Sequence, residues 1–98
     1  MVTDRMVKYT DEQKKKNMLA KMVMRRNVGE KYTPKEKVYS GIPKHERGGL
    51  ENLLDELHKD GFIEYHKGKN CVSINRYHKD IVKRYLDDEV PKFYWDNW

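Results

Sequence analysis

One continuous stretch, Leu50 to Asn75, constrains the fold more than any other part of the sequence. Its first half spaces four leucines at i, i+3, i+4 and i+7, which forms a single apolar stripe along a helix. Gly61 follows as a C-terminal cap, and two β-prone segments, 62–66 and 71–75, flank a four-residue tip, Lys67 to Asn70. The stretch therefore predicts a helix that leads directly into a tight hairpin with a basic tip. The stripe leucines are Leu50, Leu53, Leu54 and Leu57.

An earlier helix is predicted near the beginning of the chain. Thr10 and Gln13 match a capping box, and the helix that they begin should run to about Arg26. Its apolar side chains follow helical spacing and are Met18, Leu19, Met22 and Val23. Five basic side chains of the helix are expected to lie largely in solvent: Lys14, Lys15, Lys16, Lys21 and Arg25.

A second, shorter helix is predicted after an extended segment over residues 28–33. Thr33 would cap this helix, Pro34 would occupy its first position, and Glu36 would close a capping box. The helix should end near Ser40, because Gly41-Ile42-Pro43 forms a turn.

The leucine-striped helix is expected to begin near Lys44–Glu46 and to end at Asp60, which places Gly48-Gly49 inside it. Asn75 is expected to cap a last helix over residues 76–89. The side chains of that helix expected to face the core are Tyr77, Ile81, Tyr85 and Leu86. The strand side chains expected to alternate inward are Ile63, Tyr65, Val72 and Ile74.

The order of these elements resembles that of winged helix-turn-helix proteins. Small archaeal proteins of this fold share the GIPKHERGG-like turn over residues 41–49 and the VSIN-like second wing strand over residues 72–75. The resemblance covers about residues 17–87. It implies an α+β, mostly helical winged helix-turn-helix fold, with a three-helix core, a β-hairpin wing and a C-terminal helix.

The composition fits one small domain with a basic surface. The chain has 98 residues, of which 37% are hydrophobic and 38% charged. We expect a flexible N-terminus over 1–9, a winged-helix domain over 10–90 and an aromatic tail over 91–98. Residues 1–49 contain 13 Lys and Arg against 6 Asp and Glu, or +7, and residues 50–98 contain 8 against 10, or −2. The basic half could face a polyanion or form an ordinary solvated surface.

Compartment and membrane signals are few. Cys71 is the single cysteine, so no internal disulfide can form, which fits a reducing cytoplasm. No apolar run approaches the roughly 18–20 residues of a membrane span, and the first residues lack the apolar stretch of a signal peptide. We therefore expect a cytoplasmic protein without membrane contacts.

The family resemblance implies that the third helix enters the major groove of DNA with its N-terminal residues nearest the bases. Arg47 is expected either to reach a base or phosphate or to pair with Glu51. The Gly48-Gly49 pair would serve either close approach to a phosphate or tight packing against the second helix. The acidic C-terminal half of the helix should repel a duplex. The residues expected to face DNA are Lys44, His45, Arg47, Gly48 and Asn52.

The hairpin tip is the second candidate contact. The residues of the tip expected to face DNA are Lys67, Lys69 and Asn70, with His66 and Arg76 beside them. Positive charge on a flexible loop suits contact with phosphates and not the recognition of particular bases. The alternative is that these lysines only prevent association of hairpin edges.

Catalytic and metal-binding patterns are missing from the sequence. The four histidines and Cys71 form no CxxC, HxxxH or HExxH pattern. There is also no phosphate loop and no nucleophile elbow. We expect neither an enzyme nor a bound metal or other cofactor.

The tail over residues 91–98 holds both tryptophans and is expected to fold back on the helices. A dimer contact and base stacking are the alternatives. For the whole chain we expect a transcriptional regulator that binds double-stranded DNA, with a homodimer as a plausible assembly. A winged helix that binds another protein without affinity for DNA is the first alternative, and RNA binding is the second.

Overall fold

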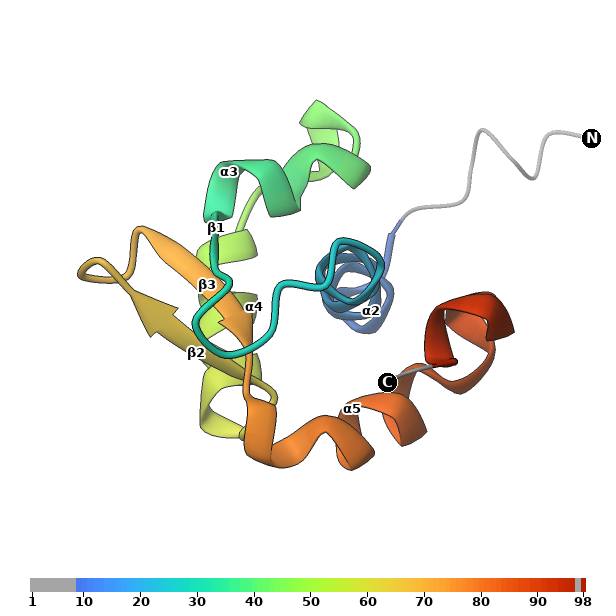
Figure 1. Cartoon of the computed structure of the whole chain (residues 1–98). Helices are drawn as coiled ribbons and strands as arrows, with labels where there is room; N and C mark the ends of the chain where they lie inside the picture. Colours follow the sequence, from blue (N-terminus) through green and yellow to red (C-terminus); the bar gives the residue numbers. More distant parts are fainter. Residues whose placement is uncertain (1–8, 97) are drawn as a thin grey trace, which may run out of the picture.

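The computed structural model describes residues 9–96 and 98. This part of the chain forms four α-helices and a three-stranded antiparallel sheet, in the order helix, strand, two helices, hairpin and helix (Figure 1). The prediction of a mostly helical α+β fold is confirmed at this level. The expected flexibility of the N-terminus falls on residues 1–8, which lie outside the described residues.

Helix α2 (Asp11–Met24) lies at the centre of the fold (Figure 1). It contacts three helices, α3 (Lys35–Val38), α4 (Leu50–Lys59) and α5 (Lys79–Leu86), and the strand β3 (Cys71–Ile74). The hydroxyl of Thr10 accepts a hydrogen bond from the N–H of Gln13 at 3.1 Å, and the Gln13 side chain accepts one from the N–H of Thr10 at 3.0 Å. The predicted capping box is therefore confirmed. The helix ends two residues before Arg26, because Arg26 adopts the left-handed conformation with φ 60°.

The hydrophobic core lies where α2, α4 (Leu50–Lys59) and the sheet meet. All four leucines of the α4 stripe are at most 4% exposed, and the four predicted apolar residues of α2 are completely buried. Burial of a leucine side chain contributes roughly 1.5–3 kcal/mol. The leucine stripe therefore sets which face of α4 remains in solvent.

The sheet joins the hairpin to a short third strand. Strand β3 (Cys71–Ile74) lies between β1 (Thr33–Pro34) and β2 (Ile63–His66). Ile63 pairs with Ile74, and both are buried as predicted. Val72, which pairs with Tyr65, is also fully buried, whereas Tyr65 itself is only partly buried.

The second predicted capping box is wrong. Thr33 lies in β1 opposite Val72 and is 6% exposed, so sheet pairing takes its backbone into the extended conformation. Helix α3 (Lys35–Val38) follows Pro34, and no side chain of the described residues caps it. A 3-10 turn, Tyr39–Gly41, completes this segment.

The predicted start of the third helix is also wrong. Lys44–Glu46 forms a separate 3-10 turn, and α4 begins only at Leu50. Gly49 has φ 77°, a left-handed conformation that interrupts any continuous helix. Gly48-Gly49 therefore lies before the helix. At the other end of α4, Gly61 has φ 85°, as expected of a C-terminal cap.

The last helix is shorter than predicted. Asn75 caps a 3-10 turn, Arg76–His78, by accepting a hydrogen bond from the N–H of Tyr77 at 3.0 Å, and α5 (Lys79–Leu86) follows. The 3-10 turn changes the helical phase, so Tyr77 is 75% exposed and its predicted place in the core is wrong. Val82 and Leu86 are the buried residues of α5.

The C-terminal tail folds back on the domain, as expected. The indole N–H of Trp98 donates a hydrogen bond to the main-chain oxygen of Lys79 at 2.9 Å, and the rings of Trp95 and Trp98 meet edge to face at 5.3 Å. Phe93 does not join this contact and is 71% exposed.

The break before α4 can be tested with two matched substitutions. We expect Gly49→Ala to lower the free energy of unfolding by about 1–2 kcal/mol, because alanine disfavours a positive φ. Gly48→Ala should be neutral or stabilising by up to about 1 kcal/mol, since its added methyl group meets open space and the backbone is ordinary. Urea unfolding measures both. Stabilisation by both substitutions would show that the helix continues through Gly48 and Gly49.

Candidate nucleic-acid interface

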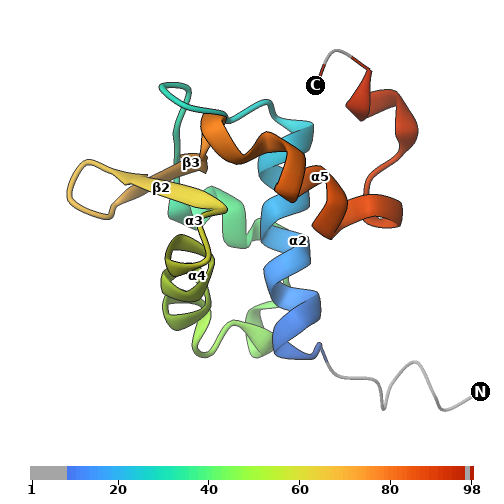
Figure 2. The same cartoon turned by 90° about the horizontal axis from the view of Figure 1, so that it is seen from below.

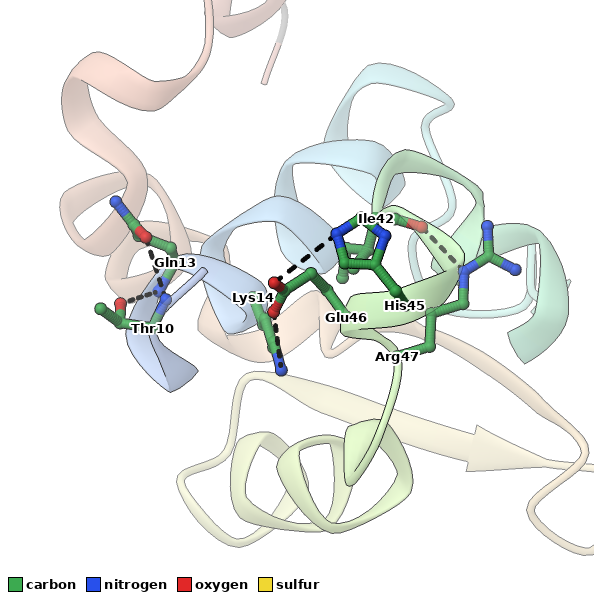
Figure 3. A network of polar contacts seen from close by, with 7 residues as sticks. All are labelled: Thr10, Gln13, Lys14, Ile42, His45, Glu46 and Arg47. Carbon is green, nitrogen blue, oxygen red and sulfur yellow. Dashed lines mark hydrogen bonds and ion pairs between the residues drawn. The ribbon is translucent and has the colours of Figure 1, made fainter. Parts of the chain in front are cut away.

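The turn between α3 and α4 presents Lys44 and His45 to solvent. The Glu46 side chain is largely buried beside them and lies 3.8 Å from the imidazole of His45 (Figure 3). Its other neighbour is Lys14, whose ammonium is 3.9 Å from the Glu46 carboxylate. Lys14 is only 9% exposed, so its predicted place in solvent is wrong. Its ion pair with Glu46 joins the turn to α2.

Arg47 does not form the predicted pair with Glu51, and its contact with a base or phosphate stays a prediction. Its Nε–H donates a hydrogen bond to the main-chain oxygen of Ile42 at 2.8 Å, which closes the turn before α4. The end of the guanidinium group points away from the turn (Figure 3). Glu51, the predicted partner of Arg47, lies instead 3.0 Å from the ammonium of Lys35.

The start of α4 is open. An added Cβ at Gly48 or Gly49 would meet no atom within 4 Å, so tight packing does not explain the glycine pair. Asn52 is exposed on the first turn of the helix. A hollow of about 450 Å³ lies beside it, lined by Tyr39, Arg47, Gly49, Leu50, Glu51 and Asn52.

Tyr39, which is partly buried, lines this hollow. Burial raises the pKa of Tyr39 to about 12, with a further contribution from the Glu51 carboxylate. The Tyr39 oxygen is buried and has no hydrogen-bond partner among the described residues.

Each of the three carboxylates on the exposed face of α4 lies beside a lysine from a different element. Lys15 comes from α2, Lys35 from α3 and Lys69 from the hairpin tip. Because these lysines are distant in sequence, no helical spacing could have predicted the pairs. They offset the acidic charge that was expected to repel a duplex. The pairs are Glu51–Lys35 at 3.0 Å, Asp55–Lys69 at 3.4 Å and Glu56–Lys15 at 2.7 Å.

The hairpin tip has a left-handed backbone. Lys67, Gly68 and Lys69 have φ values of 56°, 62° and 75°, and each lysine in this conformation costs roughly 1–2 kcal/mol. Asn70 helps to fix the tip, because its N–H donates to the main-chain oxygen of Lys67 at 3.2 Å and its own oxygen accepts from the N–H of Lys35 at 3.1 Å.

The two lysines of the tip differ in their surroundings. Lys67 is exposed, and no carboxylate of the described residues lies within 4.0 Å of its ammonium. Lys69 turns back over α4, where its ammonium lies 3.4 Å from Asp55 and 5.2 Å from the centre of the Tyr65 ring. The Tyr65 hydroxyl donates a hydrogen bond to the same Asp55 oxygen at 2.5 Å. Asp55, Tyr65 and Lys69 thus form one polar cluster between α4 and the hairpin.

His66 belongs to the sheet and not to the free tip. Its Nε2 lies 2.9 Å from the hydroxyl of Ser73, and its ring stacks on Tyr32 at 4.5 Å. Ser73 is fully buried and donates its own proton to the main-chain oxygen of Gly29 at 2.7 Å. Nε2 of His66 must therefore be the donor in its bond with Ser73.

Across the described residues, no group of three or more His, Cys, Asp or Glu side chains is placed to hold a metal ion. None of the helices in this part of the chain has the length and apolar character needed to cross a membrane. Comparisons with protein-family models, curated proteins and solved structures give no significant match to this chain.

The cluster of Asp55, Tyr65 and Lys69 changes the pKa of the Asp55 carboxyl group. The hydrogen bond from Tyr65, with a smaller contribution from Lys69, lowers the pKa of Asp55. A lowered folded-state pKa stabilises the fold above the unfolded value of about 4, and this contribution is lost as pH falls through the folded value. Tyr65→Phe should raise the pKa of Asp55 toward its unfolded value, so the pH-dependent contribution would become smaller. Carboxyl NMR titration measures this shift, and an unchanged pKa would contradict the hydrogen bond.

Proposed function

We propose that this chain is a winged helix-turn-helix protein that binds double-stranded DNA, of the kind that regulates transcription, and that it has no enzymatic activity. The sequence resemblance supports this proposal, as does the element order of the structure. A short helix, a turn and α4 precede the hairpin, and β1 pairs with the second hairpin strand (Figure 2). In this proposal α4 is the recognition helix and the hairpin is the wing.

The observation that carries the proposal is the placement of cations around α4. Lys44 lies in the 3-10 turn before the helix, and Lys67 lies at the tip of the hairpin that follows it. Both are exposed, and within residues 9–96 and 98 neither forms an ion pair. Exposed lysines without acidic partners are available to neutralise phosphates.

The start of α4 supports phosphate contact in a second way. The first N–H groups of a helix have no intrahelical acceptor and carry partial positive charge. Within the described part of the chain, no side chain caps α4, and the residue before it is Gly49. A phosphate in the adjacent hollow would receive hydrogen bonds from these N–H groups and from the outer part of Arg47. Asn52, one turn further, would then face a base edge and suits adenine.

The acidic residues of α4 limit how far a duplex can follow the helix. Their lysine partners reduce the local charge, but Asp55 and Glu56 still present oxygen acceptors and no donors. We therefore assign contact to the first turn of α4 and to the wing.

Removal of Lys44 and Lys67 should weaken binding to duplex DNA of any sequence. For Lys44→Ala combined with Lys67→Ala, we expect the slope of log affinity against log salt concentration to flatten by about 0.9 for each phosphate that is no longer neutralised. Fluorescence anisotropy between about 50 and 200 mM salt measures the slope. The matched control combines Lys31→Ala and Lys92→Ala, which remove the same charge from exposed positions outside α4 and the wing.

Two results would contradict the proposal. The first is no binding of mixed duplexes by the unmodified chain at low salt. The second is an equal flattening of the salt slope by the control pair of substitutions. In that case the loss of affinity would depend on net charge and not on the positions of Lys44 and Lys67. Stronger binding to structured RNA than to duplex DNA would show that RNA, and not DNA, is the preferred ligand.

The second candidate function is a winged helix that binds another protein. Phe93, exposed on the folded tail, and the carboxylates of α4 favour it, because an exposed aromatic residue is typical of a protein interface. Stable association with a purified protein partner through Phe93, without affinity for DNA, would favour this candidate.

A further inference from the structure

Lys69 and Lys67 lie at the same hairpin tip but have different contacts within the protein. Asp55 and Tyr65 hold Lys69 through an ion pair at 3.4 Å and a cation–π contact at 5.2 Å. Within the part of the chain that the structure describes, Lys67 has neither kind of contact. Both side chains are exposed, that of Lys69 at 63%, but only the ammonium of Lys69 lies beside a carboxylate and a ring of the described residues.

Asp55 is well placed to compete with DNA. One of its oxygens accepts the hydrogen bond from the Tyr65 hydroxyl and also faces the ammonium of Lys69. A carboxylate in this position offers Lys69 what a DNA phosphate would offer, namely an anionic oxygen, here 3.4 Å from its ammonium. The space between the cluster and Lys35 is only about 50 Å³, which leaves no room for an organic ligand.

We propose that Asp55 and Tyr65 form a latch that holds Lys69 on α4 and keeps it from contacting DNA phosphates. This inference rests on the proposed function and adds regulation of the same surface. Asp55 and Tyr65 act as positioning residues, because they act through Lys69. The latch lowers the affinity of the wing for any polyanion, so that binding depends more on the contacts at the start of α4.

The latch predicts a particular pattern of salt dependence. Because Lys69 releases few counterions while it is held, Lys69→Ala should leave the salt slope of the unmodified chain nearly unchanged, in contrast to Lys67→Ala. Asp55→Asn keeps the shape of the side chain but removes its charge. We expect this change to steepen the slope by about 0.9 and to raise duplex affinity roughly twofold to fivefold at low salt. Tyr65→Phe should shift affinity in the same direction, but less.

A double-mutant cycle separates the latch from simple charge repulsion. The gain from Asp55→Asn should largely disappear in a chain that also carries Lys69→Ala. Glu56→Gln is the matched control, because it removes a charge from the next position of α4, where the partner is Lys15 at 2.7 Å and not the wing. Its effect on affinity should be the same with and without Lys69.

Failure of the latch and failure of DNA binding give different results in these measurements. If the unmodified chain binds duplex DNA but Asp55→Asn gives the same gain with and without Lys69, the latch is contradicted and DNA binding stands. A flattening of the slope by Lys69→Ala as large as that by Lys67→Ala would contradict it equally. If the unmodified chain binds no duplex, the proposed function fails and the latch fails with it. Circular dichroism checks that each variant is folded.

Discussion

Burial of the leucine stripe of α4 against α2 and the sheet determines how the other parts of the structure are placed. It fixes the rotation of the helix, and so decides that Asn52, Asp55 and Glu56 face outward. Because the hairpin follows α4 after a single glycine-capped turn, the same packing also places this hairpin beside the outer face of α4 (Figure 2). The geometry of the candidate interface is thus a consequence of apolar packing, and its polar side chains only modify it.

The electrostatics of the outer face differ from what its composition indicates. An acidic helix would repel a polyanion, but each carboxylate of α4 has a lysine partner from another element. Such exposed pairs contribute little stability, in the range of about 0–1 kcal/mol. Their main consequence is the distribution of free charge, since they engage Lys15, Lys35 and Lys69 and leave Lys44 and Lys67 unpaired within the described residues. Under the proposed function, DNA phosphates bind where the unpaired lysines lie.

Local patterns in the sequence predicted most of the fold. The capping box at Thr10, the leucine stripe, the cap at Gly61 and the hairpin tip are all present, because each depends on residues within a few positions of one another. The errors arose where distant contacts or unusual backbone conformations decide the structure. Sheet pairing moved Thr33 out of a helix cap, and the left-handed Gly49 shortened α4. The lysine partners of α4 could not be predicted, since they depend on how three separate elements come together.

The proposed function requires duplex DNA to bind at the two margins of α4, over residues 44–52 and 67–70. Titration of the isotopically labelled chain with a mixed-sequence duplex, followed by amide NMR, locates the bound surface residue by residue. We expect shift changes concentrated in those two segments, with little change over residues 26–31 or in the tail. Changes confined to the tail, or no changes at all at low salt, would contradict binding at α4 and the wing.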